Sequence, residues 1–419
     1  MKKTATLFVI IITSFTAQSQ FIKKIGEKIK IKTTQRAEQK TDKAIDDALN
    51  KAEASGSRTA KKTDPTKPVT GATGTQQNTN ATTGIDITAT ANPAALKPYN
   101  NYDFISGDTV VFEDHFIDDQ EGEFPAHWNL GAGQGVMNTI GGQHALLLTE
   151  GNFVHVSPLI KSPSFFGDAF TIEYDYYANE SYGPHIYFYN NGKDAKAASN
   201  AIGMLSLQHN EAYAQAESAG VELTAQFPAA LMQNDYLGHW HHFAAAYKKN
   251  QLKVYIDQYR ILVVPNLGIA PHAFDIEGIG DLNAPMVFAN IRVARGAGMN
   301  MLGKKFTDAK IITHGINFDV NKATIKPESM GTLNGIVQIL KDNPEIKFEV
   351  GGHTDSDGDD VLNTKLSQAR AEAVRTQLVA MGVDAARLTA KGYGKTKPIS
   401  DNTSFEGKAN NRRVEFVKK

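Results

Sequence analysis

The residues best able to do chemistry lie in GHTDSDGDDVLNTKLSQAR, residues 352–370, where four Asp occupy six positions. A calcium loop of the EF-hand type needs oxygen ligands at positions 1, 3 and 5, glycine at position 6 and glutamate at position 12. Counted from Asp355, position 6 is Asp360 and position 12 is Leu366. The residues that shape and close such a loop are absent, so the acid run does not predict a calcium site.

Asp355 and Arg370 form a different pattern, an acid and a base that can face one cleft. Asp355 follows a predicted strand that ends at Gly351–Gly352. Asn363 is placed to cap the next helix, which puts Arg370 about two turns into it. A carboxylate binds an ammonium group, and a guanidinium binds a carboxylate through two parallel hydrogen bonds. The pair predicts a clamp for a small zwitterion, with a direct Asp355–Arg370 salt bridge as the alternative.

Four motifs around this pair resemble one known family. NFDVNKATIKPES, GHTDSDGDDVLNTKLSQARAEAV, GYGKTKPI and NNRRVEF have the order and spacing of the OmpA-like peptidoglycan-binding domain. The resemblance implies that Asp355 takes the ammonium and Arg370 the carboxylate of meso-diaminopimelate in the peptidoglycan stem peptide. We expect no cofactor, no metal and no catalytic residue there. The supporting residues that the resemblance implies are Asn321, Asn363, Arg412 and Thr354.

The elements that would carry these residues alternate between strand and helix. KIITHGINF, IKFEVGG, RLTAKGYG and NRRVEFV are typical of strands. The first predicted helix, PESMGTLNGIVQILKDN, opens with Pro327, and the second, NTKLSQARAEAVRTQLVAMG, stops at Gly382. This order predicts a compact α/β sandwich over residues 305–419.

Residues 102–297 predict an all-β fold. Short runs such as HALLL, FTIEYDYYA and HIYFYN are separated by Gly, Asn and Pro turns, which favours a sandwich or barrel. WHHFAAAYKKNQLKVYIDQYRILVVPN resembles the hairpin of laminin-G-like and concanavalin-A-like jelly rolls, and MVFANIRVA resembles their closing strand. The resemblance implies a jelly-roll sandwich that presents a second surface to a glycan or to an envelope protein.

Two kinds of chemistry compete with binding in the β-rich region. Glu173 and Asp175 share a strand face, as the carboxylates of jelly-roll glycan hydrolases do, but Glu180 comes too late to complete that motif. His239 and His241 also share a face and suggest zinc, yet no further ligands converge by sequence. We therefore expect structural roles for these side chains and no enzyme.

A transmembrane β-barrel is another alternative for residues 102–297. Strands of such barrels run about 10 residues, with apolar outer faces and aromatic girdles. Charged pieces such as DDQEGEFPAHW and LQHNEAYAQAES interrupt this pattern. A sandwich outside the membrane is favoured.

The N-terminal hundred residues predict a signal for export, a basic helix and a flexible linker. Residues 1–19 have the basic start and apolar run of a signal peptide, and without cysteine no thiol is available for lipid attachment. Residues 20–54 predict a basic amphipathic helix that contacts a membrane surface or a second copy, with a solvated spacer as the alternative. Residues 55–101, rich in Thr, Asn, Gly and Pro, predict a flexible linker.

The formal net charge of −1 gives no electrostatic reason to expect a nucleic-acid partner. Together these patterns predict a non-catalytic protein of a Gram-negative cell envelope, at the periplasmic face of the outer membrane. Its expected partner is peptidoglycan, bound through the diaminopimelate clamp.

Overall fold

The part of the chain that can be described excludes the N-terminal hundred residues. The predicted signal peptide, basic helix and linker (1–19, 20–54 and 55–101) therefore lie outside the described residues. Among the residues that are described, no helix combines the length and apolar character that crossing a membrane requires. The computed structural model describes residues 102–162, 164–179, 182–192, 198–208, 210–232, 236–296 and 308–419.

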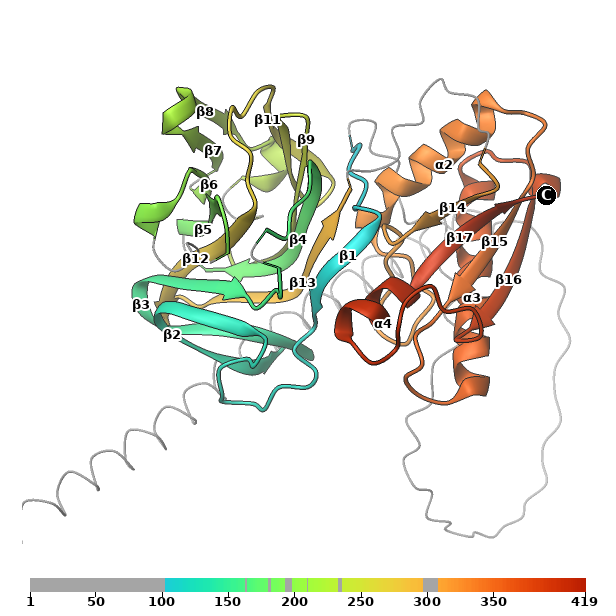
Figure 1. Ribbon diagram of the computed structural model, residues 1–419, viewed down its shortest axis with the longest axis horizontal. Helices are drawn as coiled ribbons and strands as arrows, with labels where there is room; N and C mark the ends of the chain where they lie inside the picture. The colour runs from blue at the N-terminus through green and yellow to red at the C-terminus, as the bar shows by residue number, and fades with distance from the viewer. Residues whose placement is uncertain are drawn as a thin grey trace, which may run out of the picture. The chain divides into compact units, whose positions relative to one another are not determined.

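A thirteen-stranded sheet occupies the larger, first part of the described chain (Figure 1). Its main path runs β11-β10-β9-β4-β13-β3-β12-β5-β6-β7-β8, with β1 beside β13 and β2 beside β3. The strands are β1 (Thr109–Asp114), β2 (Trp128–Ile140), β3 (Gln143–Pro158), β4 (Ala169–Ala178), β5 (Tyr182–Tyr189), β6 (Gly203–Gln208), β7 (Glu211–Ala216), β8 (Val221–Gln226), β9 (His239–Lys248), β10 (Gln251–Ile256), β11 (Tyr259–Val264), β12 (Ala273–Asp281) and β13 (Met286–Arg295).

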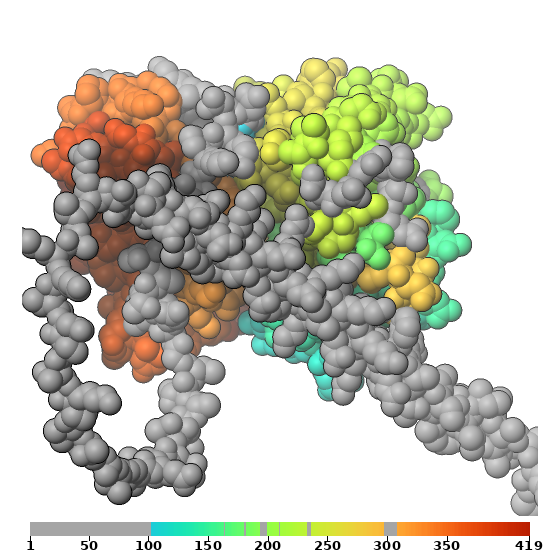
Figure 2. Space-filling model, turned by 180° about the vertical axis from the view of Figure 1, so that it is seen from behind, coloured from blue at the N-terminus to red at the C-terminus, as the bar shows by residue number. Residues whose placement is uncertain are grey.

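The large sheet nearly closes on itself, because β11 at one end of the path contacts β7 and β8 at the other. Side chains of β6, β7, β8 and β11 form part of the face seen in Figure 2 (green to yellow). The all-β prediction is confirmed at this level, and the jelly-roll connectivity stays a prediction.

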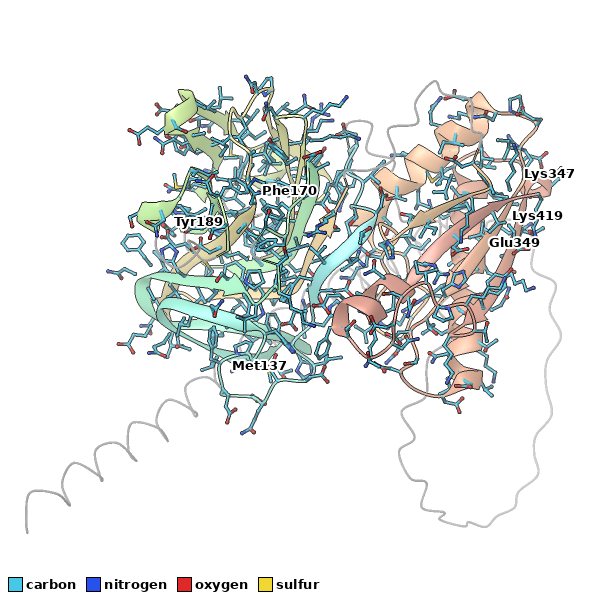
Figure 3. All side chains as sticks on the ribbon, viewed as in Figure 1. Met137, Phe170, Tyr189, Lys347, Glu349 and Lys419 are labelled. Carbon is cyan, nitrogen blue, oxygen red and sulfur yellow. The ribbon has the colours of Figure 1, made fainter. Side chains whose placement is uncertain are left out.

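Alternation along the strands separates an apolar core from a polar face. In β4, Phe170, Tyr174 and Tyr176 enter the main hydrophobic core, whereas Glu173 and Asp175 point to the other side. Phe170 and two other members of this core, Tyr189 and Met137, are labelled in Figure 3. The polar residues of the strands therefore share one face, where they pair with one another.

The last part of the chain forms a four-stranded sheet in the order β14-β17-β15-β16, with β15 and β16 parallel. Helix α3 contacts β15 and β16 (Figure 1). The strand–helix alternation is thus confirmed, but the short helix α4, capped by Ser404, was not predicted. The elements are β14 (Lys310–Thr313), α2 (Met330–Asp342), β15 (Phe348–His353), α3 (Asp360–Ala380), β16 (Leu388–Gly394), α4 (Phe405–Asn411) and β17 (Arg413–Lys418).

Residues Tyr102 to Ser106 are hydrogen-bonded to the large sheet and pack against the C-terminal part of the chain, which belongs to the same compact unit. Tyr102 and Phe104 lie in the hydrophobic cluster of α2 and β15. A Cβ added at Gly331 in α2 would stand 1.7 Å from the Phe104 carbonyl oxygen, so only glycine permits this approach. Ser106 Oγ donates to Glu173 Oε1 of β4 at 2.5 Å. The segment therefore fastens α2 to the large sheet.

The start of α3 differs from the prediction. The N-cap is Asp359, whose side chain accepts hydrogen bonds from the backbone nitrogens of Val361 and Leu362, both at 2.9 Å. The prediction that Asn363 caps this helix is wrong, because an earlier carboxylate already satisfies the free amides of the first turn. Arg370 consequently lies about three turns into α3 instead of two.

Replacing Asp359 by alanine should lower the free energy of unfolding by about 1 kcal/mol, the usual cost of losing an N-cap side chain. Urea denaturation of the purified chain measures this. The Asp359→Asn variant retains a capping oxygen and serves as the control. Equal losses in both variants would contradict the capping role.

A buried network lies on the polar face of the large sheet, on β3, β12 and β5. His155 bonds Asp275 at 3.0 Å and Glu277 at 2.8 Å, and Glu277 also bonds His185 at 2.9 Å and accepts from Tyr182 at 2.8 Å. Burial alone would lower the pKa of His155, but the two carboxylates raise it to about 9. Burial would raise the pKa of Glu277, but its partners lower it to about 2.

This network should make stability fall at alkaline pH. The pKa of His155 is raised from 6.5 to about 9 in the folded protein, so its stabilising contribution is complete below pH 6.5 and is lost as pH rises toward 9. Thermal melts between pH 6 and 9 measure the slope. His155→Gln should flatten it, and an unchanged slope in that variant would rule out this origin.

Candidate functional site

The site begins where β15 ends. Thr354 follows β15, and its backbone nitrogen donates to the Gly394 carbonyl at the end of β16 at 3.0 Å, while its hydroxyl donates to the Asp355 carbonyl at 3.0 Å. A Cβ at Gly352 would stand 2.2 Å from the Ser367 carbonyl oxygen, so glycine lets α3 lie close to the strand. Asp355 is thereby fixed at the strand end, next to α3.

The carboxylate of Asp355 has two defined partners. Arg412 Nη1 donates to Oδ2 at 2.5 Å, and the backbone nitrogen of Asp357 donates to Oδ1 at 3.1 Å. Asp355 is only 8% exposed. The predicted alternative, a direct salt bridge between Asp355 and Arg370, is not formed, because Arg412 occupies that position.

Arg370 binds a turn of backbone instead of a carboxylate. Its Nε donates to the Lys322 carbonyl at 3.0 Å and its Nη2 to the Asp319 carbonyl at 3.5 Å, while the guanidinium stands 4.9 Å from the centre of the Phe318 ring. Burial, followed by the positive charge of Arg412, lowers the pKa of Arg370 to about 10, and Asp355 opposes the shift. The guanidinium is charged at neutral pH and incompletely compensated.

The other predicted residues surround these three groups. Asn321 is exposed, has a φ of 55° and sits in the turn whose carbonyls Arg370 binds. Asn363 Nδ2 donates to the Asp357 carbonyl at 2.7 Å, so it steadies the acid loop. Asp355, Arg370 and Arg412 thus converge, and Asn321 and Asn363 belong to the two loops beside them.

One residue of this site was missed. Glu113 in β1 accepts a hydrogen bond from Arg412 Nη2 and pairs with Arg292 of β13 at 2.9 Å. Burial would raise the pKa of Glu113, but Arg292 and Arg412 hold it well below its ordinary value. No local motif marks Glu113, which lies 299 positions from Arg412.

The two carboxylates of the hydrolase alternative are occupied. Glu173 is 2% exposed and accepts from Ser106. Asp175 bonds His242 at 2.7 Å and accepts from Asn290 at 2.7 Å. Burial would raise the pKa of Asp175, but His242 and its other partners lower it to about 2. Both carboxylates therefore have protein partners.

The predicted histidines also have protein partners. His241 bonds Asp257 at 2.9 Å through Nδ1 and the Tyr236 carbonyl at 2.8 Å through Nε2, which leaves neither nitrogen for zinc. Among the described residues, one group could hold a metal ion: its ligand atoms lie within 4.8 Å of one another. Its members are Asp114, Asp119 and His127.

Comparison with known proteins identifies the region around Asp355. The model of the OmpA family matches residues 317–412. This part of the chain belongs to the OmpA family. The match includes every residue placed at the site by sequence, from Asn321 to Arg412, and excludes Glu113.

Relatives of the OmpA-family domain include a probable lipoprotein, YiaD, of Escherichia coli (strain K12), 40% identical over 29% of this chain and 56% of its own length. Outer membrane porin F of Pseudomonas fluorescens is 45% identical over 24% of this chain and 31% of its own. The solved peptidoglycan-associated lipoprotein of Burkholderia pseudomallei is 29% identical, over 28% of this chain and 94% of its own, with a TM-score of 0.24. The chain therefore spans about half or less of these two curated relatives.

Proposed function

We propose that this protein attaches non-covalently to peptidoglycan by clamping the free end of meso-diaminopimelate. That end carries one ammonium group and one carboxylate. Asp355 takes the ammonium, and Arg370 takes the carboxylate, with Arg412 holding Asp355 in place. Asn321 and Asn363 line the two sides, and Thr354 fixes the loop.

The observation that carries this proposal is the state of Arg370. Its guanidinium is half-buried, and among the described residues it has only backbone carbonyls as hydrogen-bond acceptors and no carboxylate in an ion pair with it. Burial, followed by the positive charge of Arg412, lowers the pKa of this guanidinium to about 10. A ligand carboxylate supplies the missing negative charge through bidentate bonds. Asp355, which lies near enough to act on the pKa of Arg370, supplies the second half of a zwitterion site.

The proposed cellular location follows from the curated relatives, whose names include a lipoprotein and outer membrane proteins. We place the protein in the cell envelope of a Gram-negative bacterium, at the periplasmic face of the outer membrane. The function is binding without catalysis.

Asp355→Ala and Arg370→Ala should each weaken binding to peptidoglycan that contains diaminopimelate by roughly 10- to 100-fold, the value of a hydrogen bond to a charged group. Co-sedimentation of the purified chain with insoluble peptidoglycan measures this. Lys365→Ala removes an exposed positive charge from the same helix and should leave binding unchanged.

Peptidoglycan with lysine in place of diaminopimelate provides the discriminating ligand, since lysine lacks the side-chain carboxylate. The unmodified chain should bind it about as weakly as Arg370→Ala binds the diaminopimelate type. Equal binding of the unmodified chain to both types would exclude the proposed clamp.

A further inference from the structure

Arg412 lies between two carboxylates that come from distant parts of the chain. Nη1 donates to Asp355, and Nη2 donates to Glu113 of β1. The Glu113 side chain is 6% exposed, and that of Arg412 is 34% exposed. Glu113 is therefore shielded from water, while Arg412 reaches from it to the proposed ligand site.

The large sheet fixes Glu113 firmly. Strand β1 pairs with β13 so that Glu113 stands opposite Arg292, and the two side chains bond at 2.9 Å. His115 is the other basic group nearby, at 3.8 Å from Glu113. Because one carboxylate serves both guanidinium groups, Glu113 has a defined orientation before any ligand arrives.

Arg292 also contacts the segment that contains the turn bound by Arg370. Its Nη1 donates to the His314 carbonyl at 2.7 Å and to Asn317 Oδ1 at 3.1 Å. Asn317 opens the segment that contains the turn held by Arg370, and its carbonyl accepts from the backbone nitrogen of Lys326. Residues of the large sheet thus touch the supports of both Asp355 and Arg370.

The two edges of the Arg412 guanidinium predict what Glu113 does. Glu113 binds one edge and is itself paired with Arg292, so it fixes the orientation in which the other edge reaches Asp355. Two carboxylates face two guanidinium groups here, so Glu113 acts on Asp355 by orienting Arg412. In a half-buried environment this orientation matters, because water screens the charges poorly.

We infer that Glu113 is a positioning residue of the peptidoglycan clamp, acting through Arg412, and that the large sheet thereby sets the affinity of the OmpA-family domain for an ammonium-bearing ligand. This inference rests on the proposed function. It also gives the region before residue 297 a role in the anchor itself.

The test measures the dissociation constant of a soluble muropeptide containing meso-diaminopimelate by calorimetry, using the full chain. Glu113→Gln keeps the size of the side chain and removes its charge. Binding should weaken about tenfold, within the usual range of coupling between sites. Glu113→Asp should recover part of the loss. Glu150→Gln removes an exposed carboxylate of β3 and should bind as the unmodified chain does.

A double-mutant cycle separates this role from a general loss of structure. In the Arg412→Ala background, Glu113→Gln should cause no further loss of affinity, since its route to the ligand is already cut. Full additivity of the two losses, or unchanged affinity in Glu113→Gln, would overturn the inference. If Glu113→Gln does not fold, the same cycle with Glu113→Asp decides in the same way.

Failure of the proposed function gives a different result. If the unmodified chain and Asp355→Ala bind the muropeptide equally, the clamp itself is refuted. If Asp355→Ala abolishes binding while Glu113→Gln leaves it intact, the clamp stands and only the role of Glu113 falls.

Discussion

A single guanidinium, that of Arg412, has to satisfy two carboxylates of this protein at once. Removing charges from water is costly unless they are paired and hydrogen-bonded, and breaking such a pair leaves an uncompensated charge. Arg292, Glu113, Arg412 and Asp355 meet this requirement as a chain of alternating sign. The chain fixes the position of β1 against the C-terminal strands and, at its far end, the acid of the proposed clamp.

Much of the OmpA-family part could be predicted because its signals are local. Helical periodicity, Pro327 and Gly382 indicated the helices, and the quoted motifs indicated Asp355 and Arg370. The predicted N-cap of α3 was wrong because two residues able to cap a helix, Asp359 and Asn363, lie about one turn apart. Only the backbone geometry decides between them. Their competition cannot be resolved from residue type alone.

The contacts that could not be predicted are long-range. Arg370 binds carbonyl oxygens, which every residue has, so no residue type signals them. Glu113 is one acid among 45 Asp and Glu in the sequence, and its partner lies almost 300 positions away. In the large sheet, the alternation of polar and apolar residues predicted which side chains share a face. It did not predict that the polar side chains are bonded to other parts of the protein. Glu173 and Asp175 therefore resembled a catalytic pair, although Glu173 is buried and both are bonded to protein partners.

The close approach of Phe104 to Gly331 has a consequence for related sequences. Even a methyl group at that helical position would collide with the main chain crossing it. Glycine is a poor helix former, so nothing else favours it at this point of α2 where no chain crosses. In other chains with a similar C-terminal part, a glycine at the position of Gly331 therefore marks those in which a preceding segment crosses α2 as Phe104 does here.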